Sequence, residues 1–263
     1  MATKPKKNAS YDLKAADRRR NLMIQIGLTA IVVIFAVGLV LYIVTNGSSK
    51  PAGGEAKSIR VASSKLITKE GTAEPKAVLS LYEDFLCPAC GGFEQQFGNT
   101  IKQMIDSGAI AADYYMVAIL DRPANKNYSS RSGGAAYCVA DEDTTPDKQF
   151  FSQFHAALYA QQPGEAGAIF PTDEQLIETA RQAGVAGGVP ECINNGRYLE
   201  LVDGLAAATK VNSTPTIRIN GEDYEPTTPD ALVAKIKEIV GDVPGLMTAP
   251  AAATPTQPGA PTP

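Results

Sequence analysis

Two cysteines separated by two residues are the part of this sequence best suited to chemistry. Cys87-Pro88-Ala89-Cys90 follows an apolar stretch and precedes one with helical periodicity. A thiol at a helix N-terminus faces unpaired N–H groups and the positive end of the helix dipole, which favour the thiolate. We therefore expect the pKa of Cys87 to be lowered, so that Cys87 exchanges with a partner's sulfur and Cys90, one turn deeper, resolves the mixed disulfide.

Two other interpretations of the pair remain open. The cysteines could form an inert structural disulfide, or they could supply half of a zinc site. Zinc needs two more ligands, and the candidates in this sequence are Cys138, Cys192 and His155. Because the sequence has no second Cys-x-x-Cys, we expect no metal and no cofactor.

Thr214-Pro215, directly before a predicted strand, is the second signal. An ordinary trans proline is accepted at the first residue of a strand, whereas a cis Thr214–Pro215 bond would be a rare and deliberate feature. A cis turn beside Cys87 would leave the Thr214 main chain free to pair with an extended substrate. We expect Pro215 to be cis and part of the catalytic site. The residues expected to contact the substrate are Thr214, Pro88 and Ala89.

The elements that must position these residues follow from hydrophobic patterns. Residues 58–62 and 77–82 are typical of strands, residues 90–107 of an amphipathic helix, and residues 109–120 of a further strand. A strand, a helix and a second strand form a βαβ unit, usually right-handed with parallel strands. The cysteine pair would therefore lie where the first parallel strand passes into the helix.

A helical insertion is predicted from about residue 122 to residue 210. Thr172, with Gln175 three residues later, is typical of a helix start. After the insertion, residues 216–219 predict a strand, Asn220-Gly221 predicts a hairpin turn, and residues 229–240 predict a final helix. The fold class is therefore α/β with an inserted helical domain.

Cys138 and Cys192 both fall in the predicted insertion. We expect them to form a structural disulfide that closes a long loop, which would stabilise the fold by roughly 4 kcal/mol. The alternative is a second redox pair that relays electrons, although no motif supports it.

Residues 22–44 contain no charged side chain and predict one transmembrane helix. At about 1.5 Å per residue they would span roughly 35 Å, enough to cross a hydrocarbon core of about 30 Å. A cleaved signal peptide is the alternative, but its apolar region is usually shorter and ends in a small-residue cleavage site. Residues 45–57 are rich in Gly, Ser and Ala and predict a flexible linker.

The charges around this span predict its orientation. The preceding residues 1–21 form a basic tail, and positive flanks remain in the cytoplasm. The N-terminus is therefore expected to be cytoplasmic and the domain at 58–243 extracytoplasmic, on a single-pass protein of the cell membrane. Residues 244–263 are dominated by Ala, Pro, Thr and Gly and predict a disordered tail. The net charge of −4 argues against a nucleic-acid partner.

The motifs at residues 84–90, the helical insertion, and Thr214-Pro215 before a hairpin and helix together resemble the DsbA-like thioredoxin-fold proteins. More narrowly, the chain is similar to the membrane-anchored DsbA-like proteins of actinobacteria. The resemblance covers about residues 59–242. It implies a thioredoxin fold split by a helical domain, with Cys87 as nucleophile, Cys90 as resolving cysteine and Pro215 as the cis proline. It also implies reoxidation by a membrane enzyme of the DsbB or VKOR type.

The sequence departs from the pattern of this family at two positions. Many relatives carry an acidic residue six positions before the first cysteine, where this chain has Leu81; Glu83 or Asp84 are the candidates to replace it. The best-known oxidants of the family carry histidine inside the motif, where this chain has Ala89. Thr214 before the proline also occurs in isomerase-like members.

These observations predict a membrane-tethered thiol–disulfide oxidoreductase that oxidises cysteine pairs in exported proteins. A reductase or disulfide isomerase of the same compartment is the alternative within the enzyme class. A non-catalytic thioredoxin-fold binding module is the alternative outside it.

Overall fold

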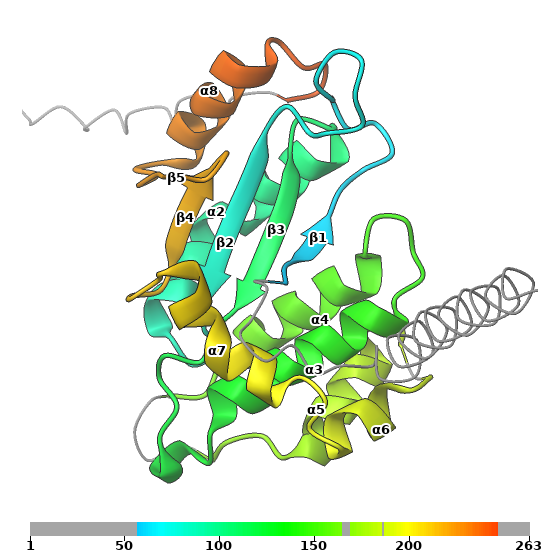
Figure 1. Cartoon of the computed structure of the whole chain (residues 1–263), viewed down its shortest axis with the longest axis vertical. Helices are drawn as coiled ribbons and strands as arrows, with labels where there is room; N and C mark the ends of the chain where they lie inside the picture. The colour runs from blue at the N-terminus through cyan, green and yellow to red at the C-terminus, as the bar shows by residue number, and fades with distance from the viewer. Residues whose placement is uncertain (1–56, 165–168, 186, 247–263) are drawn as a thin grey trace, which may run out of the picture. The chain divides into compact units, whose positions relative to one another are not determined.

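The computed structural model describes residues 57–164, 169–185 and 187–246 (Figure 1). All of them belong to the second of the two units into which the chain divides, residues 53–263. The predicted basic tail and transmembrane helix lie outside the described residues, as do almost all of the predicted linker and C-terminal tail. Among the residues that are described, no helix is both long and apolar enough to cross a membrane.

A five-stranded mixed sheet forms the centre of the domain, with the strand order β1-β3-β2-β4-β5. In that order the strands are β1 (Ile59–Val61), β3 (Ala111–Met116), β2 (Val78–Glu83), β4 (Thr216–Ile219) and β5 (Glu222–Asp223). β2 and β3 are parallel, with Leu81 opposite Tyr114, and the other three pairs are antiparallel. The predicted βαβ unit is confirmed, since the helix α2 (Pro88–Asp106) connects β2 to β3.

α2 buries one apolar stripe against the sheet and carries the cysteine pair at its first turn. The buried stripe comprises Phe93, Phe97, Ile101, Met104 and Ile105. The helix begins at Pro88 rather than at Cys90, because proline needs no amide partner in the first turn and its φ suits a helix. It ends beside Gly108, whose positive φ of 80° reverses the chain.

The strand that follows α2 is shorter than the predicted range 109–120. The first two residues of the predicted range, Ala109 and Ile110, complete the end of α2 instead. Their amides donate to the carbonyl oxygen of Met104. Pairing with β2 ends where β2 ends, at Glu83 opposite Met116. The apolar residues beyond this point therefore continue as a loop toward the insertion.

In its described residues, the insertion begins with a 3-10 turn at Pro123–Asn125 and continues as five helices. These are α3 (Tyr128–Glu142), α4 (Gln149–Ala160), α5 (Asp173–Gln182), α6 (Val189–Asn194) and α7 (Leu199–Thr209). They lie together at the end of the sheet where β2 and β3 terminate (Figure 1). α4 contacts α2, while α3 and α7 contact β3. The predicted cap at Thr172 is confirmed as a capping box with Gln175.

The chain returns from the insertion into the sheet through Thr214-Pro215 and β4. Asn220 and Gly221 both have positive φ, 51° and 89°, and they form the predicted hairpin turn between β4 and β5. The last helix, α8 (Pro229–Val240), is capped by the Thr228 side chain and packs against α2.

A disulfide joins Cys138 of α3 to Cys192 of α6, with a Cα–Cα distance of 5.8 Å and a sequence separation of 54. Both cysteines are buried in the helical insertion, away from the Cys87–Cys90 pair, whose thiols are free. The bond therefore fastens two insertion helices to each other.

Replacing Cys138 and Cys192 together by alanine should lower the free energy of unfolding by about 2–4 kcal/mol, because the unfolded chain loses a cross-link over a long loop. Urea unfolding of the double variant and the wild type, both with Cys87–Cys90 reduced, measures the difference. If the disulfide is only a staple, the reactivity of Cys87 stays unchanged; a loss of Cys87 reactivity in the folded double variant would instead indicate a redox role.

Candidate active site

Cys87 occupies the N-cap position of α2, with extended backbone angles of φ −75° and ψ 115°. No side chain caps the first turn, so its N–H groups are available to the cysteine sulfur. The side chain is 7% exposed, and its two neighbours Pro88 and Ala89 are exposed. Cys87 is therefore buried itself but borders two exposed residues that a second protein can contact.

The surroundings of Cys87 stabilise its thiolate and lower its pKa from the ordinary 9.0 to about 5. The largest cause is a hydrogen bond from the Cys90 side chain; the Thr214 side chain and the amides of Cys90 and Ala89 act in the same direction. Partial burial of the sulfur raises the pKa, but its effect is smaller than the combined effect of the hydrogen bonds. Cys87 is therefore largely a thiolate at neutral pH.

Cys90 has the opposite character. It is 0% exposed, and burial is the main cause that raises its pKa; its hydrogen bond to Cys87 and the negative charge of Glu83 raise it further. The pair thus combines a thiolate at Cys87 with a more deeply buried, protonated thiol at Cys90, an asymmetry suited to stepwise disulfide exchange.

The Thr214–Pro215 peptide bond is cis and lies beside the cysteine pair. The thiol form of Cys87 donates to the carbonyl oxygen of Thr214 over 3.3 Å, although 127 residues separate the two in sequence. Within the described part of the chain the Thr214 amide has no hydrogen-bond partner. Thr214 is only partly buried, so its backbone is available to an extended peptide.

Asp84 supports the turn that leads into Cys87. It is fully buried, and its two carboxylate oxygens accept from the amides of Leu86 and Leu120, each over 2.9 Å. Both oxygens are thereby used to hold the loops at the carboxyl ends of β2 and β3. Asp84 is thus a structural residue at the entrance to α2.

Gln162, just beyond α4, reaches the same turn from the insertion. Its Nε2 donates to the carbonyl oxygens of Phe85 and Cys87, each over 2.9 Å. Its Oε1 lies so close to Gly91 that a Cβ there would approach it to 2.4 Å. Gln162 therefore joins the helical insertion to the backbone of the reactive cysteine.

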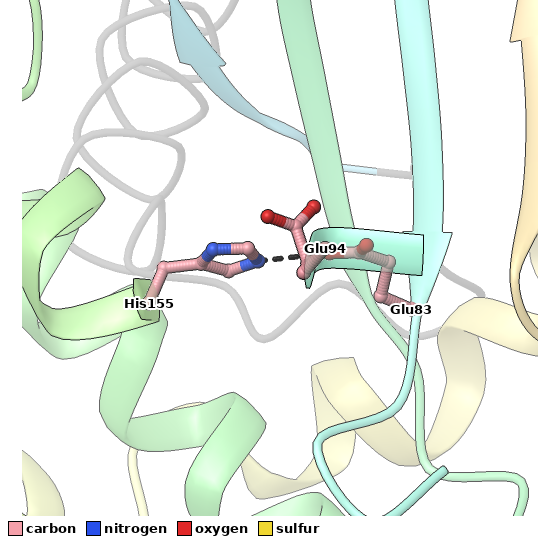
Figure 2. Close-up of side chains that lie close together, drawn as sticks. All are labelled: Glu83, Glu94 and His155. Carbon is pink, nitrogen blue, oxygen red and sulfur yellow. Dashed lines mark hydrogen bonds and ion pairs between the residues drawn. The ribbon is translucent and has the colours of Figure 1, made fainter. Parts of the chain in front are cut away.

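Glu83, Glu94 and His155 lie close together in a polar cluster (Figure 2). Glu83, the last residue of β2, places Oε2 2.8 Å from Nε2 of His155. Burial is the main cause that raises the pKa of Glu83 and of Glu94 to about 8 and lowers the pKa of His155. His155 is buried among aromatic rings that include Tyr114 and Tyr159.

The sequence did not single out Gln162 or Glu94. Gln162 belongs to no motif, and its partners are backbone atoms 75 and 77 residues away. Glu94 lies in the predicted helix, where periodicity marks only the apolar stripe. In hindsight, Glu94 offers one local signal, its position one helical turn after Cys90.

The alkylation rate of Cys87 by iodoacetamide should rise as the pH increases through about 5 and level off well before neutral pH, because only the thiolate reacts. The rate is measured on the reduced protein by mass spectrometry, with Cys87→Ala as the unreactive control. A midpoint near the ordinary thiol value of about 8.5 would contradict the stabilisation described above.

Replacing Gln162 by alanine should destabilise the protein by about 1–2 kcal/mol, because two carbonyls lose their donor, and should slow Cys87 alkylation above pH 7 several-fold. Gln161→Ala is the matched control, since the neighbouring Gln161 is exposed. Urea unfolding and the alkylation rate are the two measurements. Equal behaviour of the two variants would show that Gln162 does not hold the turn.

Comparisons with known proteins identify relatives of this chain. A family model described as Thioredoxin matches residues 68–238. DsbA of Mycobacterium tuberculosis, in a reduced crystal structure, is 60% identical, with a TM-score of 0.70 over 72% of this chain and 95% of that chain. The reduced disulfide bond oxidoreductase DsbG of the same organism is 60% identical, with a TM-score of 0.70 over 74% and 92% of the two chains.

More distant relatives share the fold or a part of the sequence. The thiol–disulfide oxidoreductase MdbA of Corynebacterium matruchotii is 20% identical with a TM-score of 0.55, over 67% of this chain and 87% of that chain; this likeness concerns the fold alone. The serine/threonine-protein kinase PknE of M. tuberculosis is 28% identical over 150 residues, which are 56% of this chain. The match spans 25% of the kinase, so this chain corresponds to about a quarter of these curated relatives.

The family match covers most of the domain, and the relatives at 60% identity are disulfide oxidoreductases of nearly the same extent as the described residues. This favours an enzyme over the non-catalytic binding module. The chain belongs to the thioredoxin family, and within it to the DsbA-like thiol–disulfide oxidoreductases.

Proposed function

We propose that this oxidoreductase introduces disulfides into exported proteins, using Cys87 and Cys90 as its redox-active pair. The observation that carries the proposal is the difference between Cys87, whose pKa is lowered to about 5, and the more deeply buried, protonated Cys90. Such a difference favours the reduced form of the enzyme, and an enzyme whose reduced form is favoured oxidises its clients.

The exchange proceeds in two displacements. A client thiolate attacks Sγ of Cys87 in the oxidised enzyme, the Cys87–Cys90 bond breaks, and the sulfur of Cys90 leaves and takes up a proton. A second client thiolate then attacks the client's sulfur in the mixed disulfide and displaces Cys87 as a thiolate. The low pKa of Cys87 makes it a good leaving group. Two electrons pass from the client to the enzyme, and the client gains one disulfide.

An extended client segment would bind across the rim of the site. The free Thr214 amide and the exposed Pro88 and Ala89 provide a backbone donor and an apolar contact next to the sulfur. This is strand addition, in which main-chain hydrogen bonds give affinity with little demand on client sequence.

The compartment is part of the same proposal. Residues 22–44 would anchor the protein in the cell membrane with the N-terminus in the cytoplasm and the domain outside. The Cys138–Cys192 disulfide supports this location, because such bonds persist in oxidising compartments. The reduced pair must then pass its two electrons to a membrane oxidant, which we propose to be of the DsbB or VKOR type.

A reductase or isomerase in the same compartment is the second candidate. Ala89 is the observation that favours it, because its side chain offers the Cys87 thiolate no hydrogen bond. Against it, a thiol pKa of about 5 instead of 9.0 corresponds to a reduction potential raised by on the order of 100 mV. The balance favours the oxidant.

The reduction potential of the Cys87–Cys90 pair, measured in glutathione redox buffers, decides between the two. A value well above about −200 mV is expected for the oxidant, whereas a value near −270 mV would indicate a reductase. In cells, Cys90→Ala should accumulate mixed disulfides through Cys87 with exported proteins, and Cys87→Ala is the control. The absence of trapped exported clients would contradict the proposed substrate class.

A further inference from the structure

Glu83, Glu94 and His155 bring two carboxylates and an imidazole together from three different elements, β2, α2 and α4. One ligand atom from each lies within 4.8 Å of the other two. Figure 2 shows the three side chains converging from the strand and the two helices. In sequence, Glu83 precedes the Cys87–Cys90 pair, Glu94 follows it, and His155 lies far from both. The disulfide exchange described above uses none of the three side chains.

Two oxygens of this cluster lack a partner. Oε1 of Glu83 and Oε1 of Glu94 are inaccessible to solvent and make no hydrogen bond with the described residues. Glu83 as a whole is 0% exposed. Unsatisfied carboxylate oxygens inside a protein are rare, and each one requires a bound proton, water or ion to explain it. The Glu83 and Glu94 carboxyl groups lie close enough to share a proton, and a bound cation in place of that proton would satisfy both oxygens.

No basic side chain neutralises the cluster. Among the ion pairs of the described residues, the only one that involves either glutamate is the contact of Glu83 with His155. His155 itself is 4% exposed, and burial disfavours its protonated form. An incoming ion would displace the protons that the raised pKa values, about 8, keep on Glu83 and Glu94 at neutral pH. The two carboxylates and the neutral imidazole would then balance the charge of a divalent ion.

A cavity borders the cluster on the side of Glu94 and His155. A cavity of about 510 Å³ between α2 and α4 is lined by Glu94 and His155, together with Gly91, Gly98 and Tyr114. Gly98 shapes this side of the site, because a Cβ there would lie 2.8 Å from Oε2 of Glu94. The cavity offers an entry path and room for a water ligand.

We propose that Glu83, Glu94 and His155 bind a divalent transition-metal ion, with Zn²⁺ as the representative ion. Imidazole together with carboxylate oxygens suits Zn²⁺ or Mn²⁺, whereas Ca²⁺ and Mg²⁺ prefer oxygen ligands alone. Three protein ligands and a water from the cavity complete a tetrahedral Zn²⁺ site.

The distances allow this with small side-chain movements. Tetrahedral ligands at about 2.0 Å from the ion lie roughly 3.3 Å apart. On metal binding, the 2.8 Å distance between Glu83 Oε2 and His155 Nε2 would lengthen slightly. The longest distance between ligand atoms, which is within 4.8 Å, would shorten. Glu94, which is only partly buried, is the ligand most able to move.

The test uses the full chain in detergent with Cys87 and Cys90 joined as a disulfide, so that these sulfurs cannot bind the metal. Calorimetric titration with ZnCl₂ at pH 7 should show one equivalent bound and a raised melting temperature. Glu94→Gln and His155→Gln should each weaken binding at least tenfold. Glu178→Gln, which alters an exposed ion pair with Arg181, is the control and should bind as the wild type does.

A pair of glycine variants tests the site without removing a ligand. Gly98→Ala should displace the Glu94 carboxylate and weaken Zn²⁺ binding several-fold. Gly92→Ala, on the same helix but with nothing within 4 Å of the added Cβ, should leave it unchanged. If His155→Gln fails to fold, Glu94→Gln and Gly98→Ala still decide the matter.

Substitution with Co²⁺ identifies the ligands by spectroscopy. The proposed site predicts weak visible bands without sulfur-to-metal charge transfer. The proposal is overturned if no stoichiometric binding occurs, if Glu94→Gln binds as the wild type does, or if sulfur ligation appears. The first of these results would mean that bound protons, and not a metal, satisfy the two carboxylates.

Discussion

The structure depends on keeping one sulfur of a vicinal pair negatively charged while the other remains protonated. Two thiols so close together in sequence would ordinarily titrate alike. Here the N-cap position gives Cys87 the helix amides and the hydrogen of Cys90, whereas burial at the next turn keeps Cys90 neutral. The two effects reinforce each other, because a protonated Cys90 is the donor that stabilises the Cys87 thiolate. The proposed direction of the exchange rests on this one interaction.

The remainder of the domain fixes that geometry from three separate parts of the chain. Asp84 holds the loops that follow β2 and β3, Gln162 holds the backbone of Cys87 from the insertion, and Thr214 approaches from the segment before β4. The helical insertion therefore does more than pack against the end of the sheet. It contributes a direct contact to the reactive turn, and its disulfide between α3 and α6 stiffens the body from which that contact is made.

Local patterns in the sequence predicted the elements well and the contacts between distant elements poorly. The βαβ unit, the capping box at Thr172 and the Asn220-Gly221 hairpin were predictable because each depends on neighbouring residues. The strand at 109–120 was predicted too long, because apolar residues at its two ends serve a helix end and a loop. Gln162 and the Glu83–Glu94–His155 cluster were not predicted, because their meaning comes from partners that only the folded chain brings together.

The most direct test of the central claim is an NMR pH titration of the reduced protein with ¹³C-labelled cysteine Cβ, which reports the two thiols separately. The account predicts that the Cys87 signal titrates near pH 5 and that the Cys90 signal does not titrate over the range in which the protein stays folded. Two signals that titrate together near the ordinary thiol value, or a Cys90 signal that titrates first, would contradict it.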